Sequence, residues 1–359
     1  MSQFKINSIT DKTGTSGPVI AGVSTNNSTG CMIIPAGPTE HRGGRGRLIF
    51  GGGYDYPSPY TELATMDMVE ISTLGNSVDF GDMTQGRSAG NMGSSGTRGI
   101  MAAGGYPGNP TPGRSQVIDY VTFQSGGGMN DFGELSAAPI KAHGFGNGVR
   151  GVFAGGYSGD SPYGTSTTMQ YVNIATLGNS IVAFGEINPG PDQAHGSKGN
   201  MSVADRTRGC MGGLTTYYHP ATTKTNTIVF VTTATLGDSQ DFGDLTVARD
   251  NSNGVSSSTT RGLFYSGSPG PTAVKNTIDY ITIQTKGNAV NFGDMTSSGN
   301  NGGSLHGSNL TRSVNYAGST LAEIEYVTIT TLGNTQDFGD ITVARVPYAG
   351  LDNSNGSIE

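Results

Sequence analysis

The sequence predicts an all-β protein built from six similar units, and three observations support this prediction. A Phe-Gly-acid triplet returns six times at intervals of 46 to 58 residues, with Phe80, Phe132, Phe184, Phe242, Phe292 and Phe338 as its aromatic residues. Short runs rich in Val, Ile, Thr and Tyr lie between the triplets, as is typical of strands. Glycine contributes 59 of the 359 residues without a three-residue period, which favours tight turns over collagen. A strand-rich repeat of about 50 residues predicts a β-propeller.

Each unit opens with a short apolar run that an arginine leads and glycines close, as in residues 150–156 (RGVFAGG). Glycines at the end of a strand allow another backbone to approach closely, and the centre of a ring of wedge-shaped blades is crowded. We therefore predict that this run is the inner strand of its blade. The units start near residues 47, 98, 150, 208, 261 and 312.

A strand with alternating polarity follows, and one of its positions is aromatic in five units. This aromatic slot holds Met68, Tyr120, Tyr171, Phe230, Tyr280 and Tyr326. A Gly-Asn or Gly-Asp turn comes next, replaced by three glycines in the second unit, and these residues tolerate the positive φ of a two-residue hairpin. The Phe-Gly-acid triplet marks a third strand, and the polar stretch after it predicts a fourth.

Two charged positions recur in all six units. One is the leading arginine, and the other is the acid that closes the triplet: Asp82, Glu134, Glu186, Asp244, Asp294 and Asp340. We expect each arginine to pair with such a carboxylate within or between blades, because a guanidinium can bind a carboxylate through two hydrogen bonds. The repeated Asp-Phe-Gly sequence lacks the other kinase motifs, so kinase chemistry is excluded.

These motifs resemble two known kinds of repeat. The Gly-Gly doublet before a Tyr-containing strand is similar to kelch-type β-propellers, although this chain has no Trp and the triplet Phe takes the place of the usual kelch Trp. The stretches ATLGNSIVAFGEI (175–187), ATLGDSQDFGDLTVAR (234–249) and TTLGNTQDFGDITVAR (330–345) resemble a repeat of predicted virion and tail-fibre proteins of bacteriophages, especially marine ones. This resemblance spans residues 46–359. It implies a six-bladed kelch-like β-propeller within a virion protein.

Residues 1–45 lie outside the repeats and are rich in Gly, Ser, Thr and Pro, so we expect a short irregular N-terminal segment. The segment resembles those with which phage tail fibres dock onto the particle or trimerise, which implies other phage structural proteins as partners. A flexible leader that lies across the propeller explains the composition equally well. Homo-oligomerisation stays open in either case.

Composition and charge exclude several classes of partner and several cellular locations. A net charge of −7 argues against nucleic acid as a partner, because no basic stripe is present to bind phosphates. No apolar run is long enough for membrane insertion, and no signal peptide is visible at the N-terminus. Cys31 and Cys210 form no disulfide framework and no metal-binding spacing. We expect synthesis in the host cytoplasm and a final location in the virion.

The loops between the Gly-rich strand and the aromatic strand differ from unit to unit, and in a propeller such loops emerge on one face. They hold Tyr54, Tyr56, Tyr60, Tyr106, Tyr157, Tyr163, Tyr217, Tyr218 and His219. Rigid loops rich in Tyr and Pro gain contact area at a low entropy cost, and Tyr rings stack on sugar rings. We predict that these residues bind a host-surface receptor, a glycan or a protein. The same residues would suit contact with a neighbouring subunit, so a purely structural virion role is the alternative.

Three histidines follow the triplet strand at loosely equivalent places: His143, His195 and His306. Imidazoles that converge on the axis could bind a metal ion. Asn91 and Asn253 take comparable places in other units, however, so the position can simply be polar. We predict neither a metal site nor a cofactor.

The sequence predicts no catalytic residues and no enzymatic activity. Nucleophile elbows and phosphate-binding loops are absent, and the Asp-box of sialidase-type propellers would require a Trp. A polysaccharide depolymerase is the least favoured alternative, because the loops offer few carboxylates for its acid–base pair: Asp55 with Glu62, and Asp160.

Overall fold

The computed structural model describes residues 46–55, 61–88, 90–106, 113–158, 164–188, 201–218, 221–250, 252–269, 276–297, 304–318, 321–346 and 349–354, and the backbone of 24–26 and 31–33. The chain divides into two compact units, Met1–Glu40 and His41–Glu359. In the first, β1 (Ser24–Asn26) and β2 (Cys31–Ile33) pair antiparallel. The second contains all the repeats.

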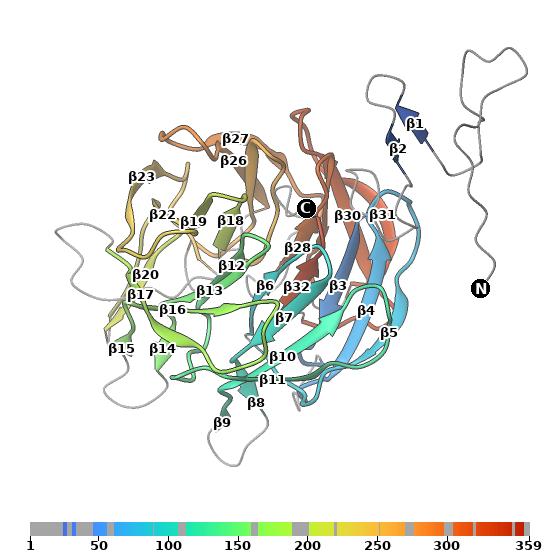
Figure 1. Cartoon of the computed structure of the whole chain (residues 1–359). Coiled ribbons are helices and arrows are strands. Elements are labelled where there is room, and N and C mark those ends of the chain that lie inside the picture. The colour runs from blue at the N-terminus through green and yellow to red at the C-terminus, as the bar shows by residue number, and fades with distance from the viewer. Residues whose placement is uncertain are drawn as a thin grey trace, which may run out of the picture. The chain divides into compact units, whose positions relative to one another are not determined.

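In the second unit, small antiparallel sheets ring an axis as in a β-propeller (Figure 1). Every regular element in the described ranges is a strand, which confirms the all-β prediction. Each sequence repeat supplies three strands that pair antiparallel in chain order, and we number these groups repeat 1 to repeat 6. They are β3 (Arg47–Gly51), β4 (Thr65–Glu70) and β5 (Val78–Asp82); β7 (Arg98–Ala102), β10 (Val117–Thr122) and β11 (Asn130–Glu134); β13 (Arg150–Ala154), β16 (Thr168–Asn173) and β17 (Ile181–Glu186); β19 (Arg208–Gly212), β22 (Thr227–Thr232) and β23 (Gln240–Asp244); β25 (Arg261–Tyr265), β26 (Thr277–Thr282) and β27 (Val290–Asp294); and β29 (Arg312–Tyr316), β30 (Glu323–Thr328) and β31 (Gln336–Asp340).

The strand nearest the axis is the one that precedes the arginine-led strand in the chain, so the prediction that the arginine-led strand is innermost was wrong. The inner strands are β6 (Asn91–Ser94), β12 (His143–Gly146), β18 (Met201–Ala204), β24 (Asn253–Val255) and β28 (Leu305–Ser308). They contact one another around the axis, and β24 pairs in parallel with both β18 and β28. Glycine makes this approach possible, because a Cβ on Gly144 or Gly254 would meet the backbone of the neighbouring inner strand.

The last described strand closes the ring. β32 (Ala349–Asp352) pairs antiparallel with β3 and so becomes the inner strand of repeat 1. Next to this pairing, the backbone N–H of Arg47 donates to Asn353 Oδ1 at 2.8 Å. The two ends of the propeller are therefore held together by one sheet.

The repeated Gly-Asn and Phe-Gly-acid motifs bind each repeat to the next at the rim. In all six cases the carbonyl of the triplet Phe accepts a hydrogen bond, 2.6–3.0 Å long, from the turn glycine of the following repeat. The triplet glycine has φ between +132° and +157°, and a Cβ there would collide with that same turn. In five repeats the turn Asn or Asp also accepts from the backbone N–H of the triplet acid. We call this set of contacts the rim clasp.

The leading arginines do not pair with the triplet acids, which corrects a second prediction. In repeats 2 to 6 each guanidinium stacks on the aromatic slot of its own strand group, 4.5–4.9 Å from the ring centroid. In all six repeats Nη1 donates to a backbone carbonyl of the next repeat. No ion pair among the described residues involves a triplet acid, and these acids lie at the surface or half-buried.

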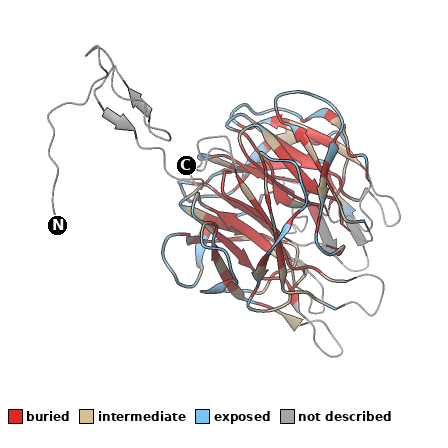
Figure 2. Ribbon diagram, turned by 90° about the vertical axis from the view of Figure 1, so that its right-hand side faces the viewer, coloured by how far each residue is buried: buried red, intermediate tan, exposed pale blue. Residues whose placement is uncertain are grey.

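The triplet phenylalanines anchor the core, as the sequence predicted. Each is at most 7% exposed. In repeats 2 to 6 the ring packs edge-to-face on the aromatic slot, with centroids 5.9–6.1 Å apart. Buried residues follow the strands throughout the propeller (Figure 2). Such aromatic pairs add to the burial energy of each blade because edge-to-face packing is favourable.

Candidate functional site

The variable loops and the linkers between repeats share one end of the propeller, because successive strands run antiparallel. Three of the loops form hairpins: β8 (Gly105–Tyr106) with β9 (Gly113–Arg114), β14 (Tyr157–Ser158) with β15 (Gly164–Thr165), and β20 (Thr215–Tyr218) with β21 (Ala221–Lys224). Figure 1 shows β8–β9 and β14–β15 projecting from the lower edge of the ring. We call this end the loop face and the opposite end, which carries the Gly-Asn turns, the turn face.

The predicted receptor-binding residues lie in these loops, but the structure describes only part of the set. Tyr54 and Tyr157 are half-buried, and each forms a backbone bridge to the linker of a neighbouring strand group. The backbones of Tyr106, Tyr217 and Tyr218 belong to the hairpin strands. The other predicted residues lie outside the described ranges: Tyr56, Tyr60, Tyr163 and His219. Asp160 lies outside them as well.

Beneath the loop face, three of the linkers place a buried arginine against the next repeat. We call the place where a linker meets the next repeat a junction. Each arginine pairs with the Asp that directly precedes the aromatic slot: Arg87 with Asp119, Arg249 with Asp279, and Arg345 with Asp67. All six side chains are at most 3% exposed. Because one charge of such a pair left alone in the core is costly, the pairs tie neighbouring repeats together.

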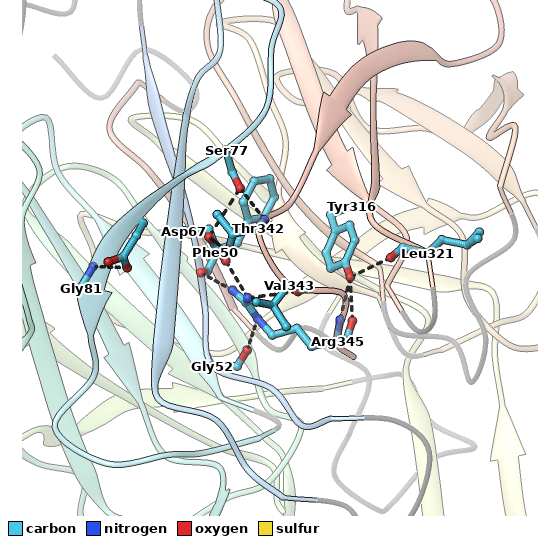
Figure 3. Close-up of polar contacts among 11 residues, drawn as sticks. Phe50, Gly52, Asp67, Ser77, Gly81, Tyr316, Leu321, Thr342, Val343 and Arg345 are labelled. Atoms are coloured by element: carbon cyan, nitrogen blue, oxygen red, sulfur yellow. Dashed lines mark hydrogen bonds and ion pairs between the residues drawn. The ribbon is translucent and has the colours of Figure 1, made fainter.

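Arg345 shows the complete arrangement (Figure 3). Its Nη1 lies 2.6 Å from Asp67 Oδ2, while Nε and Nη2 donate to the carbonyls of Gly52 and Phe50 at 3.0 and 3.1 Å. Arg249 repeats this pattern with the carbonyls of Ser266 and Phe264. In both junctions the guanidinium therefore satisfies a carboxylate and two carbonyl groups.

The third pair uses one of these carbonyl positions and one carbonyl of the following strand. Arg87 Nη1 donates to the carbonyl of Ala103, at 3.4 Å, and to that of Val117, at 2.7 Å. Burial raises the pKa of Asp119, and the charge of Arg87 opposes this rise. Burial likewise lowers the pKa of Arg87 against the influence of Asp119.

The junction between repeats 2 and 3 has the same backbone but lacks the pair. The residue after each buried arginine bridges to the next stretch of the ring, at Ser88↔Gly105, Asp250↔Ser268 and Val346↔Tyr54. The corresponding bridge here is Ile140↔Tyr157, so Pro139 takes the place of the arginine. Gln170 directly precedes the aromatic slot residue Tyr171 and takes the place of the aspartate.

A cleft of about 250 Å³ lies at this junction on the loop face. It is lined by Arg114, Ser136, Ala137, Ala138, Pro139, Gly155, Gly156, Tyr157, Ser166, Thr168, Gln170 and Val182. The cavity that touches Arg87 at the junction between repeats 1 and 2 measures only about 10 Å³. The cleft therefore exists where a bulky buried side chain is replaced by Pro139.

Gln170 is the central polar group of the cleft and is only 4% exposed. Its Oε1 accepts hydrogen bonds from Ser136 N, Ser136 Oγ and Ser180 Oγ at 2.7–3.0 Å. A backbone N–H can only donate, so the atom that faces Ser136 N must be the oxygen of the amide. The Nε2 group is thereby directed away from Ser136, and it has no hydrogen-bond partner among the described residues.

The Gly155 carbonyl is the second unsatisfied group beside the cleft. Its counterparts are the carbonyls of Gly52, Ala103 and Ser266, each of which accepts from a buried arginine. Within the described part of the chain the Gly155 carbonyl accepts no hydrogen bond. The cleft thus offers a donor and an acceptor that the protein itself leaves unused.

Two of the three histidines are buried on inner strands, at successive rather than equivalent register positions. His143, the first residue of β12, pairs with Ala154, whereas His306, the second residue of β28, pairs with Asn315. Neighbouring residues of a strand point to opposite sides, so these two side chains do not share a position. His195 lies outside the described ranges.

Burial keeps both histidines neutral at physiological pH, and protein groups occupy their ring nitrogens. His143 Nδ1 lies 3.1 Å from the Met201 carbonyl, and burial lowers the pKa of His143 to about 4. His306 lies between the hydroxyls of Ser252 and Ser256, and burial lowers the pKa of His306 to about 3. Each imidazole is occupied by protein groups.

The described residues contain no group of three or more His, Cys, Asp or Glu side chains placed to hold a metal ion. Cys210 is a buried free thiol, and burial raises its pKa, which makes it unreactive. No helix in the described ranges is long and apolar enough to cross a membrane. Comparison of the sequence with protein-family models and with curated proteins finds no match.

Sequence reasoning missed the buried pairs and the cleft. The signal for the pairs is visible in the printed sequence, because Arg249 and Arg345 stand in the repeated Val-Ala-Arg and each has an Asp before the aromatic slot of the next repeat. The cleft carries no such signal. It depends on Pro139 and Gln170, which lie far apart in the chain and depart from the pattern at the same junction.

Proposed function

We propose that this protein is a six-bladed kelch-like β-propeller of a bacteriophage virion, in a tail fibre or another tail-associated part. We further propose that its loop face binds a host-surface receptor, a glycan in preference to a protein. The virion assignment rests on the resemblance of its repeats to those of phage tail-fibre proteins. The receptor assignment rests on the loop face.

One observation carries the receptor assignment: a cleft of about 250 Å³ opens on the face where the repeats differ. The rim clasp and the leading-arginine contacts account for what the repeats share, so these motifs build the scaffold. Variable loops on a rigid scaffold are where binding sites are concentrated. Tyr157, a predicted site residue, lines the cleft itself.

A purely structural virion protein is the second candidate, and the turn face favours it. Four turns there carry leucines that are 51–54% exposed: Leu74, Leu177, Leu236 and Leu332. Exposed apolar side chains on a flat face suit contact with another protein. In this alternative the loops also contact virion subunits, and no host receptor is bound.

Antibody labelling of intact virions tests the virion assignment. Label at fibre tips or other host-facing extremities is the expected result. Label scattered over the capsid or the neck would support the structural candidate, and virions without label would overturn the virion assignment.

Adsorption of the full-length protein to host cells tests the receptor assignment. Tyr106→Ala combined with Tyr217→Ala changes two loops and should weaken adsorption while the melting temperature stays the same. Leu177→Ser on the turn face is the matched control and should leave adsorption unchanged. Undiminished adsorption of the double variant would refute the role of the loop face.

A further inference from the structure

We propose that the cleft at the Pro139 junction is a binding site for a single hydroxyl-rich sugar ring. This inference deepens the proposed function and rests on it for its biological setting, since the sugar would belong to the host-surface glycan. Its chemical basis is separate and lies in the comparison of four junctions within one chain.

The three filled junctions show what this place in the fold normally contains. A planar polar group, the guanidinium, lies between one acidic side chain and carbonyls that follow the arginine-led strand. Because the repeats share the same backbone, largely the same polar groups surround the guanidinium position in each junction. The Pro139 junction keeps the carbonyl and loses the guanidinium.

The unsatisfied groups indicate that a ligand replaces the missing side chain. Gln170 Nε2 is a donor on a side chain that is 96% buried, and the Gly155 carbonyl is an acceptor at the cleft wall. Gln170 Nε2 is not one of the fully buried side-chain atoms that lack a partner, so this donor is open to solvent at the cleft. Water can satisfy both groups in the free protein, and a ligand that displaces this water must offer both an acceptor and a donor.

A sugar hydroxyl provides both functions in one group. Ser166, Thr168 and Tyr157 also line the cleft, and a tyrosine is a residue on which sugar rings stack. A cation would need the carboxylate that Gln170 replaces, and the lining contains no Asp or Glu. Arg114 also lines the cleft but already has an interaction partner, and a phosphate would face the Gly155 carbonyl, which repels anions. A neutral polyol fits the remaining set of groups.

Size limits the ligand to one ring. Pockets for drug-sized molecules measure about 300–1,000 Å³, and this cleft measures about 250 Å³. One pyranose of a longer glycan would therefore enter the cleft, while its neighbours would extend over the surrounding loops.

Gln170→Glu is the sharpest test because it deletes the donor and keeps the acceptor. Repeat 6 already carries Glu325 at the corresponding place, where it accepts from Thr296, Ser297 and Thr335 much as Gln170 accepts from Ser136 and Ser180. The substitution is thus tolerated by this backbone. Glu325→Gln is the matched control, since it makes the reverse change away from the cleft.

The measurement is ligand-observed saturation-transfer NMR on the full-length protein, with the methyl glycosides of glucose, galactose, mannose and N-acetylglucosamine as probes. We expect at least one probe to bind, Gln170→Glu to weaken it about tenfold, and Glu325→Gln to leave it unchanged. A second variant, Pro139→Arg with Gln170→Asp, rebuilds the buried pair and should abolish binding without lowering the melting temperature. Absence of transfer to every probe, or transfer that both variants retain, would overturn the proposal.

Host-cell adsorption separates this inference from the proposed function. If Gln170→Glu adsorbs normally while the loop tyrosine variant does not, the loop face binds the receptor and the cleft does not. If the sugar binds in the cleft and the wild-type protein fails to adsorb to any host cell, the cleft inference holds and the receptor function fails.

Discussion

The Arg345 junction and the Pro139 junction have the same contacts between neighbouring repeats except at the position of the buried guanidinium. At the Arg345 junction, a guanidinium, a carboxylate and two carbonyls satisfy one another in the core. At the Pro139 junction, the rim clasp and the leading-arginine contact are the same, but the place of the guanidinium is open. A repeat fold thus obtains a cleft by deleting a side chain rather than by adding a loop, and the neighbouring contacts keep the ring intact.

The largest effect should come from breaking a filled junction. Arg345→Leu leaves Asp67 buried without its partner and should lower the free energy of unfolding by about 3–5 kcal/mol. Pro139→Ala at the open junction removes no buried partner and should cost about 1 kcal/mol or less. Urea unfolding followed by circular dichroism measures both. Replacing Asp67 by Leu as well should recover much of the loss, and equal midpoints for Arg345→Leu and the wild type would show that the pair contributes nothing.

Low pH should destabilise the Pro139 junction more than the Arg345 junction. The inner strand that follows Pro139 begins with His143, whereas the inner strand that follows Arg345, β32, has Ala349 at the same register position. Burial lowers the pKa of folded His143 to about 4, below the value of about 6.5 for an unfolded His. The unfolded chain therefore binds the proton first, and stability is complete above pH 6.5 and falls as the pH drops towards 4. The expected loss from this residue is about 3 kcal/mol at pH 4.

His143→Asn checks the origin of that loss, since Asn91 occupies the same register position in repeat 2. The variant should show a flatter decline of melting temperature between pH 6.5 and 4 than the wild type. His306 has a still lower pKa and should supply most of the decline that is left. Parallel curves for wild type and variant would contradict the assignment.

Substitutions in the rim clasp should destabilise both junctions equally, because the two junctions differ only in their linkers and in the residue that faces each linker. Gly133→Ala and Gly339→Ala each push a Cβ into the turn of the next repeat, at Gly178 and Gly75 respectively. Each should cost about 2 kcal/mol or more, from positive φ together with the collision. Gly75→Ala meets no neighbour and should cost less, so thermal denaturation of the three variants separates collision from backbone strain.

The smallest effect concerns the leading arginines. Arg150→Met and Arg312→Met each remove a guanidinium that stacks on a tyrosine and donates to a carbonyl of the next repeat. Because these groups are partly exposed, each loss should be about 1 kcal/mol. Differential scanning calorimetry should show similar shifts for the two. A much larger shift for either would mean that one of these contacts is buried more deeply than its counterpart.

The parts of the fold that recur in every repeat were predictable from the sequence, because repetition itself is the signal. The triplet Phe, the aromatic slot and the glycine turns behave as their spacing indicates. The order of strands within a sheet was not predictable, since the polar stretch before Arg98 or Arg150 has neither the length nor the alternation of a clear strand. Its place at the axis follows from glycines such as Gly144 that allow close approach, which only the assembled ring reveals.

The sequence indicated the face of the propeller on which the candidate site lies, but not Gln170, the central polar residue of the cleft. Variable tyrosines marked the loop face, and Tyr157 does line the cleft. Gln170 looks unremarkable in the sequence, where it lies in a strand beside an aromatic residue. Its importance comes from Pro139, thirty-one positions away, and from an arginine that both junction residues lack. Absence of a side chain leaves no motif to find.

The closure by β32 also means that the order of the repeats along the chain is incidental to the ring. Gly46 and Ser354 adjoin each other at the turn face, and the junction between repeats 6 and 1 has the same clasp as the other five. A circularly permuted gene, with these two residues fused through a short Gly-Ser connection and new termini opened in another linker, should give the same propeller. Permutation would allow a display partner or a label to be attached beside any chosen repeat.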